Sequence, residues 1–365
     1  MAIKQYPFYI KSTIILLGLI LLIYVFATLA DILIPLAFAA FLAVLLNPLV
    51  NRFESYKIPK IAAILLAILI FAIGVAGVFY FLSTQIIQFG DSLPMFKQKF
   101  AVMNADLKNW VQQTFGLAIS KQDQMIKDAL SSSQEMATKT LGTVLGMFAI
   151  MFILPVYIFL MLLYKTLILN FFFEVFSKEN SEQVGDVLKE TKTAVQSYIV
   201  GLLIEMIIVA AMNSVALVAL GVKYGILIGC IGAILNLIPY LGGIIAIALP
   251  VLMATVTKDG YTTQLLVIGA YAVIQFIDNN ILVPRIVSSK VQINALVSIV
   301  IVLLGNALWG ISGMFLSIPF IAVVKIIFDH IPTLKPWGKL FGDNIPTKHK
   351  GQLWTKNRKE AVGVK

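Results

Sequence analysis

The chain consists largely of apolar runs, each long enough to cross a membrane as a helix. A membrane-spanning helix needs about 20 consecutive apolar residues. Seven runs are of this kind, and they cover residues 14–30, 32–50, 61–82, 141–163, 198–220, 262–283 and 295–328. With 59% hydrophobic and 13% charged residues, the composition is that of a membrane protein rather than a soluble one of 365 residues. The sequence therefore predicts an all-α, polytopic membrane protein.

One further apolar segment, residues 225–256, is interrupted by residues that disfavour a continuous helix. The interrupting residues are Asn236, Pro239, Tyr240, Gly242 and Gly243. Broken backbone at membrane depth is tolerated only where protein or a water-filled cavity covers it, and such breaks indicate transport sites. The last run is interrupted in a similar way around Asn306 and Gly310. This pattern is typical of paired broken helices in a transporter core, or of two glycine-rich helices that pack closely.

The basic residues indicate how the chain is oriented in the membrane. Lysine and arginine flank the first run, the loop at residues 51–60 and the tail at residues 335–365. Because such residues concentrate in cytoplasmic segments, we expect both termini to be cytoplasmic and the number of crossings to be even. Eight crossings follow if residues 225–256 cross once as a broken element, and a re-entrant hairpin is the alternative for this segment. With eight crossings, Arg285 and Lys290 would lie outside, which the same rule disfavours.

The runs and the segments between them divide the chain into five regions. They are an N-terminal three-span region (1–92), an extracytoplasmic amphipathic insert (93–140), a fourth span with a cytoplasmic amphipathic helix (141–196), a transport core with broken helices (197–330) and a basic cytoplasmic tail (331–365). In the insert, Phe96, Phe100, Met103 and Leu107 recur at helical spacing. An apolar stripe of this kind in a short insert needs a burial partner, so we expect a homo-oligomer.

The fifth run contains a carboxyl group, Glu205, with Asn213 further along the same helix. A charged side chain at the centre of a membrane span costs about 2.5–3.5 kcal/mol and usually faces the protein interior. Burial favours the neutral form of a carboxyl group, which suits proton or cation handling. A glutamate that only hydrogen bonds to a neighbouring helix fits the same pattern, and both interpretations stay open.

The seventh run ends in a second group of polar residues. Gln275, Asp278 and Asn279 are spaced at i, i+3 and i+4, so they share one face of a helix. Arg285, seven residues after Asp278, could pair with it. In that case the group would be an ion pair that locks the end of a helix, and not part of a transport site.

Three motifs in the second half of the chain carry a family resemblance. They are residues 236–243 (NLIPYLGG), 278–285 (DNNILVPR) and 310–319 (GISGMFLSIP). In this order and spacing they resemble the autoinducer-2 exporter family of bacterial inner-membrane permeases, and the similarity covers nearly the whole chain. The resemblance implies a multi-span transporter with cytoplasmic termini. The family name implies export of a furanone-type signal molecule, although members are also assigned to sodium/proton antiport.

The leading functional hypothesis is therefore a secondary transporter that exports a small polar solute or signal molecule. The first alternative is a sodium (cation)/proton antiporter that uses Glu205 and Asp278. The second is an oligomeric membrane scaffold or passive pore. The candidate pathway residues are Glu205, Asn213, Asn236, Pro239, Tyr240, Gly242, Gly243, Gln275, Asp278, Asn279, Arg285 and Asn306.

Enzymatic activity is not expected from this sequence. The two histidines, His330 and His349, lie at or beyond the end of the last run, and no HExxH, GxSxG or P-loop motif is present. Cys230 lies in an apolar run and is expected to be a packing residue. We expect no cofactor and no metal. The expected partners are the lipid bilayer, a small polar solute or a monovalent cation or proton, and further copies of the chain, but no nucleic acid.

Overall fold

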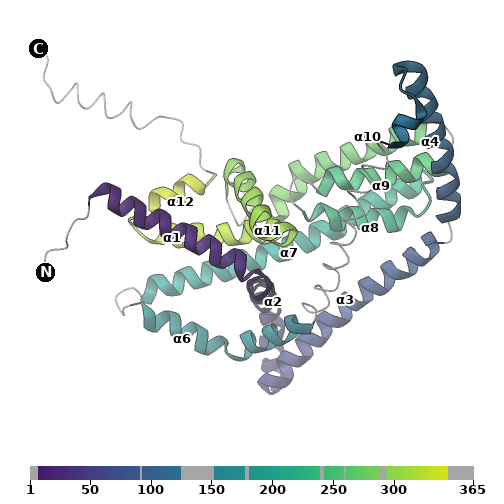
Figure 1. Cartoon of the computed structure of the whole chain (residues 1–365). Coiled ribbons are helices and arrows are strands. Elements are labelled where there is room, and N and C mark those ends of the chain that lie inside the picture. Colours follow the sequence, from purple (N-terminus) through teal and green to yellow (C-terminus); the bar gives the residue numbers. More distant parts are fainter. Residues whose placement is uncertain are drawn as a thin grey trace, which may run out of the picture.

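The computed structural model describes residues 7–90, 93–124, 152–176, 181–238, 242–258, 260–287 and 293–343 (Figure 1). Within these ranges the regular structure is helical, apart from one isolated bridge between Ile293 and Gly342. The elements are α1 (Phe8–Thr28), α2 (Ala30–Ser55), α3 (Lys60–Gly90), α4 (Leu93–Phe115), a helix at Phe152–Leu163, α6 (Lys165–Val175), α7 (Ser181–Ala219), α8 (Gly225–Asn236), α9 (Gly242–Thr257), α10 (Thr262–Ile277), the π-helical segment η2 (Asp278–Val287), α11 (Ala295–His330) and α12 (Lys335–Phe341).

Six of the described helices are long and apolar enough to cross a membrane. They are α1, α2, α3, α7, α10 together with η2, and α11. The helix Phe152–Leu163 and α6, which meet at an angle of 61°, are a seventh candidate if they form one bent span. These helices confirm the predicted all-α polytopic class. The first part of the predicted run 141–163 lies outside the described residues.

The segment 225–256 forms a hairpin, not a single broken crossing. Its two helices, α8 and α9, pack against each other through Ile228 and Ala246 within one apolar cluster. A Cβ atom placed on Gly221, just before α8, would lie 3.1 Å from the Lys258 Nζ atom, just after α9. The segment therefore begins and ends on the same side of the hairpin, which we call the base of the α8–α9 hairpin. The expectation of one net crossing is wrong.

Glycine at position 242 is what permits this reversal. A Cβ atom on Gly242 would overlap the carbonyl oxygen of Leu235, so any larger residue would hold the two arms apart. The motif that predicts a break is thus the tip of a hairpin. Pro239 and Tyr240, two of the candidate pathway residues in this motif, lie outside the described residues.

The last run also folds back on itself. The backbone of α11 leaves helical geometry at Trp309 and Gly310, where Gly310 has φ 59° and ψ −141°, a conformation that glycine adopts readily. Beyond this kink the Ser317 Oγ donates a 3.0 Å hydrogen bond to the carbonyl oxygen of Ile301. The arms of α11 therefore lie side by side and antiparallel (Figure 1). The predicted interruption near Gly310 is thus a second hairpin. Although α11 is long and apolar enough to cross a membrane, its two ends lie at the same end of the hairpin, so it adds no net crossing.

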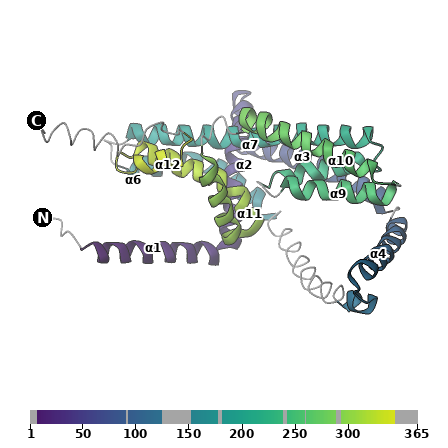
Figure 2. The same ribbon diagram turned by 90° about the horizontal axis from the view of Figure 1, so that it is seen from above.

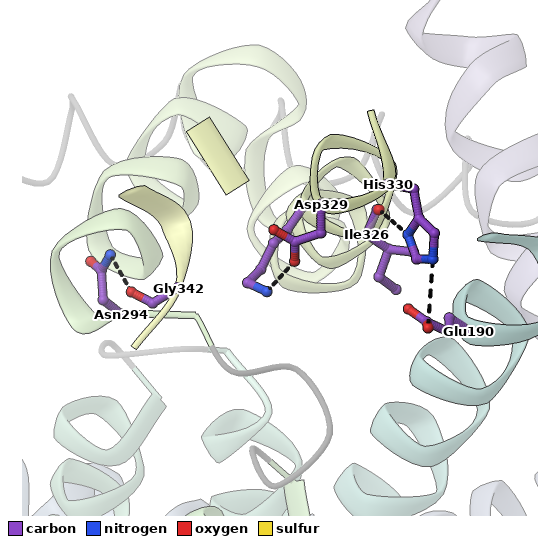
Figure 3. A network of polar contacts seen from close by, with 7 residues as sticks. Glu190, Asn294, Ile326, Asp329, His330 and Gly342 are labelled. Carbon is purple, nitrogen blue, oxygen red and sulfur yellow. Dashed lines mark hydrogen bonds and ion pairs between the residues drawn. The ribbon is translucent and has the colours of Figure 1, made fainter. Parts of the chain in front are cut away.

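The base of α11 is tied to α12 and to the N-terminal part of α7. The Asn294 side chain accepts a hydrogen bond from the Val297 backbone N–H and donates one to the carbonyl oxygen of Gly342. The His330 Nε2 atom, at the far end of α11, lies 3.7 Å from the Glu190 Oε1 atom of α7 (Figure 3). Because the α8–α9 base follows the C-terminal end of α7, the two hairpins start from opposite ends of that helix.

Because of this arrangement, Arg285 lies at a different end of α7 from the one expected from the sequence. The η2 segment runs back along α7, and a Cβ atom on Gly201 would lie 2.6 Å from the carbonyl oxygen of Ile286. Arg285 therefore lies toward the same end of α7 as α12, which precedes the basic tail. Its expected position opposite that tail is wrong, because residues 225–256 do not add a net crossing. The tail itself, from residue 344 on, lies outside the described residues.

The opposed hairpins lead to a labelling prediction. In a background in which Cys230 is replaced by serine, a cysteine at Tyr261 and a cysteine at Trp337 should react with an impermeant maleimide from opposite sides of the membrane. Both positions are exposed, Tyr261 beside the α8–α9 base and Trp337 on α12. Mass spectrometry of oriented vesicles gives the labelled fraction. Labelling of both positions from one side would contradict the opposed arrangement.

Two elements lie at the edge of the bundle. The helix α1 has no buried residue and runs apart from the other helices, although the Trp309 Nε1 donates to the Phe26 carbonyl oxygen (Figure 2). The helix α4 matches the predicted amphipathic helix of the insert. Its Leu107 and Trp110 side chains are exposed. The expectation that such residues contact further copies of the chain stays a prediction.

Candidate functional site

Asp278 lies where α10 passes into the π-helical segment η2, and its side chain is only 2% exposed. Wide turns of this type often occur at functional sites. The Asn236 Nδ2, at the tip of the α8–α9 hairpin, donates a 2.8 Å hydrogen bond to the Asp278 Oδ2. The Gln275 Nε2, one turn earlier on α10, donates a longer hydrogen bond of 3.5 Å to the same oxygen. Asp278 therefore links α10 to the hairpin tip.

A second carboxyl group, that of Glu205 on α7, contacts Asp278. Glu205 is 5% exposed, and its side chain lies within hydrogen-bonding reach of the Asp278 carboxyl group. Two carboxyl groups can form a hydrogen bond only when one of them carries a proton. If both are ionised, the Asp278 Oδ1 has no hydrogen-bond donor among the described residues, and the two charges repel. A proton on one of the two carboxyl groups would remove this repulsion and allow a hydrogen bond between them.

A small cavity adjoins this carboxyl pair. Its lining residues come from α7, α8, α9, α10 and the start of η2, and they are Val209, Asn213, Gly232, Asn236, Ala246, Tyr271, Ile274, Gln275 and Asp278. The enclosed space holds about one water molecule. The cavity therefore lies where three separate membrane elements meet: α7, the α8–α9 hairpin and α10.

Three residues of the cavity wall each have a buried oxygen atom without a hydrogen-bond partner among the described residues. These atoms are the Asn213 Oδ1, the Tyr271 OH and the Asp278 Oδ1. Leaving a buried polar group unsatisfied costs about 1–3 kcal/mol, and such groups in native proteins usually bind water, an ion or a ligand. The chemistry of the cavity is therefore that of a site for something small that oxygen atoms can bind.

Two glycines of the α8–α9 hairpin, Gly232 and Gly243, lie close to cavity residues. A Cβ atom on Gly232 would lie 3.4 Å from the Asn213 Nδ2 and 3.5 Å from the Tyr271 OH. A Cβ atom on Gly243 would overlap the Gln275 Oε1. Glycine at position 243 therefore leaves room for the Gln275 side chain, whereas a Cβ atom at position 232 would make only ordinary van der Waals contacts.

The structure brings together most of the residues predicted from sequence. Glu205, Asn213, Asn236, Gln275 and Asp278 lie at the carboxyl pair or along the cavity wall. The predicted glycines, Gly242 and Gly243, lie at the hairpin tip and against Gln275. The common cause is that polar groups on apolar helices avoid lipid by packing against one another.

Three predicted residues are exposed and belong neither to the carboxyl pair nor to the cavity wall. Asn279 and Arg285 are exposed on η2, and Asp278 forms no ion pair with Arg285 in the part of the chain that the structure describes. The expected lock between these two residues is therefore wrong, since Asp278 faces α7 instead. Asn306 is exposed on the first arm of α11. Asn279 still contacts a residue of the cavity wall, because its Oδ1 accepts a 3.2 Å hydrogen bond from the Gln275 Nε2.

Sequence reasoning did not identify Tyr271. It belongs to the cavity wall, and its hydroxyl group has no partner among the described residues, although its ring packs in an apolar cluster. Tyr271 precedes Asp278 by seven residues, which places both on one face of α10. This spacing is the feature of the sequence from which Tyr271 could have been predicted. No group of three or more histidine, cysteine, aspartate or glutamate residues that could hold a metal occurs within the described ranges.

The fold and the site are those of a polytopic membrane transport protein. They combine membrane-length helices, two opposed hairpins and a buried carboxyl pair beside a polar cavity. The family model of the AI-2E family transporter matches residues 14–333. The chain therefore belongs to the AI-2E transporter family, which confirms the resemblance noted from its motifs.

Two relatives illustrate the similarity. The "Putative transport protein YrrI" of Bacillus subtilis (strain 168) is 25% identical over 304 residues, which are 81% of this chain and 86% of that protein. The "AI-2 transport protein TqsA" of Escherichia coli (strain K12) is 24% identical over 300 residues, which are 82% of this chain and 86% of that protein. Each match covers most of both chains.

Proposed function

We propose that this protein is a secondary transporter that exports a small polar solute across the bacterial inner membrane in exchange for protons. The observation that carries the proposal is the contact between Glu205 and Asp278 beside the polar cavity. Membership of a transporter family supports transport as the activity. The printed name of the relative TqsA supports autoinducer-2 as a first solute to test.

The hairpin tip supplies a physical means of coupling. Asn236 at the tip donates a hydrogen bond to Asp278, which in turn contacts Glu205 on α7. Loss of the shared proton leaves two adjacent negative charges, and their repulsion weakens the packing of α7 against the hairpin tip. A ligand or proton that binds one arrangement more tightly than the other shifts the population between them. Proton release and movement of the α8–α9 hairpin are thereby linked.

For the orientation, we propose that both termini are cytoplasmic and that the base of the α8–α9 hairpin faces the outside. Basic residues support this orientation, because Arg285 lies toward the same end of α7 as α12, and the tail that follows α12 is basic. If the solute leaves in exchange for protons that enter from the outside, those protons need a route from the base of the α8–α9 hairpin to the carboxyl pair.

A second candidate function is the exchange of a monovalent cation for protons. The specific observation that favours it is the size of the cavity, which holds about one water molecule and whose wall includes Asn213, Tyr271 and Asp278, each with an unpartnered oxygen atom among the described residues. Hard cations prefer oxygen ligands. A larger solute requires the hairpin to move away from α7, whereas a bare cation does not.

Flux measurements on proteoliposomes test both candidates. The purified chain, reconstituted with an imposed pH gradient, should move autoinducer-2 against its own gradient and stop when the pH gradient is collapsed. Sodium flux under the same gradient, without movement of autoinducer-2, would favour cation exchange. Absence of flux for autoinducer-2, sodium and protons alike would favour the scaffold interpretation and contradict the proposal.

A further inference from the structure

One face of α10 carries a row of buried oxygen atoms without partners among the described residues. They are the Gln264 Oε1, the Tyr271 OH and the Asp278 Oδ1. The three residues follow one another at seven-residue steps, and their side chains are 7%, 6% and 2% exposed. Seven residues make nearly two helical turns, so the three groups share one face at intervals of about 10 Å along the helix. The opposite face of α10 is apolar and exposed, as at Leu265 and Val273.

The row begins at the base of the α8–α9 hairpin and ends at the carboxyl pair. Gln264 lies in the first turn of α10, three residues after the exposed Tyr261. The last step of the row, from Tyr271 to Asp278, is bridged by the cavity, whose wall contains both residues. A water molecule held in this cavity lies beside polar side chains of the row. The cavity therefore lies along the last step of the row, between Tyr271 and Asp278.

The step from Gln264 to Tyr271 is closed by apolar packing. Val267, which lies between them on α10, is 0% exposed, as are Leu217 of α7 and Ala254 of α9. The three belong to one apolar cluster together with the ring of Tyr271. An apolar constriction of this kind excludes water and so blocks conduction.

We propose that Gln264, Tyr271 and Asp278 mark the route by which protons reach the carboxyl pair from the base of the α8–α9 hairpin, with Val267, Leu217 and Ala254 as its gate. The inference rests on the proposed function, because it needs the carboxyl pair to exchange protons. In each step a water or hydroxyl oxygen accepts a proton from the side of the hairpin base as one of its own O–H bonds breaks and that proton bonds to the next oxygen. No oxygen along the route is left charged, and the last proton binds a carboxylate oxygen of the pair. Movement of α9 away from α7 and α10 opens the gate.

At the hairpin base the route begins near four titratable residues: Lys223, Tyr224, Lys258 and Tyr261. Farther in, the titratable groups are few. On α7 they are Glu205 and Tyr198, and on α10 with the start of η2 they are Tyr271 and Asp278. The helix α8 contributes Cys230, and α9 carries no titratable side chain. The carboxyl pair is therefore where a proton that enters along α10 is held.

Val267→Thr tests the gate, because threonine has nearly the shape of valine but adds a hydroxyl group that binds water. Proteoliposomes containing a pH-sensitive dye should show a proton leak under an imposed membrane potential, about tenfold faster than with the unmodified chain and without added solute. Val273→Thr is the matched control, since it makes the same change on the exposed face of α10 and should leave the leak rate unchanged. Elution as a single peak on size exclusion verifies that both variants fold.

Tyr271→Phe tests the route from the other direction. It keeps the packed ring but removes the hydroxyl group, so pH-driven proton flux should fall about tenfold. If Val267→Thr causes no leak and Tyr271→Phe no loss, the route is wrong, even when a Glu205→Gln variant has lost its flux. If Glu205→Gln keeps full pH-driven flux while Val267→Thr leaks, the proton route stands but the proposed coupling at the carboxyl pair fails.

Discussion

Replacing Glu205 by glutamine is expected to abolish pH-dependent flux while leaving the protein folded. The glutamine amide has the shape of the protonated carboxyl group and can still donate a hydrogen bond to Asp278, so the packing of α7 against η2 is kept. It cannot release a proton, however, so the pair can no longer alternate between its two states. We expect at least about a hundredfold loss of pH-driven flux in proteoliposomes, the scale on which positioned proton transfer groups act.

A matched control is available on the same helix. Glu182→Gln makes the same chemical change in the exposed first turn of α7, far along the helix from Glu205. It should retain the flux of the unmodified chain. Full transport with unchanged pH dependence in Glu205→Gln would rule out a coupling role and leave Glu205 as a residue that only packs and hydrogen bonds.

Gly313→Ala is expected to cause the largest loss of stability among single-methyl changes in the α11 hairpin. A Cβ atom on Gly313 would overlap the carbonyl oxygen of Gly305 on the other arm, and backbone on both sides would have to move. Forcing extra volume into such a contact costs about 3 kcal/mol. Thermal unfolding in detergent, followed by intrinsic fluorescence, should show a clearly lower midpoint than for the unmodified chain.

Gly269→Ala provides the contrast for this measurement. Gly269 lies within α10, and a Cβ atom there would meet no atom within 4 Å. Alanine in a helix interior is more favourable than glycine by roughly 0.5–1 kcal/mol, so the midpoint should stay or rise slightly. Equal midpoints for the two alanine variants would mean that the arms of α11 do not touch as described.

The membrane helices and the polar site could be predicted from the sequence, but the direction that the chain takes after each interruption could not. The membrane helices could be predicted because each residue's preference for lipid depends on its own side chain, and runs of such residues add up locally. The gathering of Glu205, Asn236 and Asp278 could be predicted for a related reason, since polar groups on apolar helices are driven into one protected interior. Neither inference needs knowledge of which segments are neighbours.

Tyr271 was harder to recognise, because a tyrosine in an apolar run packs as an ordinary aromatic residue. Only the neighbouring glycine at position 232 and the cavity make its hydroxyl group part of the site. In the same way, Arg285 has the right spacing to pair with Asp278, but the π-helical segment leaves Arg285 exposed while Asp278 faces α7. Spacing along a helix does not determine which group a neighbouring helix presents.

The sequence by itself determined the membrane class, the family motifs and most members of the polar site. The tertiary structure alone decided that the two interrupted segments reverse direction and start from opposite ends of α7. That decision depends on close approaches between distant residues, such as Gly221 with Lys258 and Gly305 with Gly313. A break in a helix allows the chain to turn. The direction of the turn depends on which other segment the backbone can pack against, and this is not encoded near the break itself.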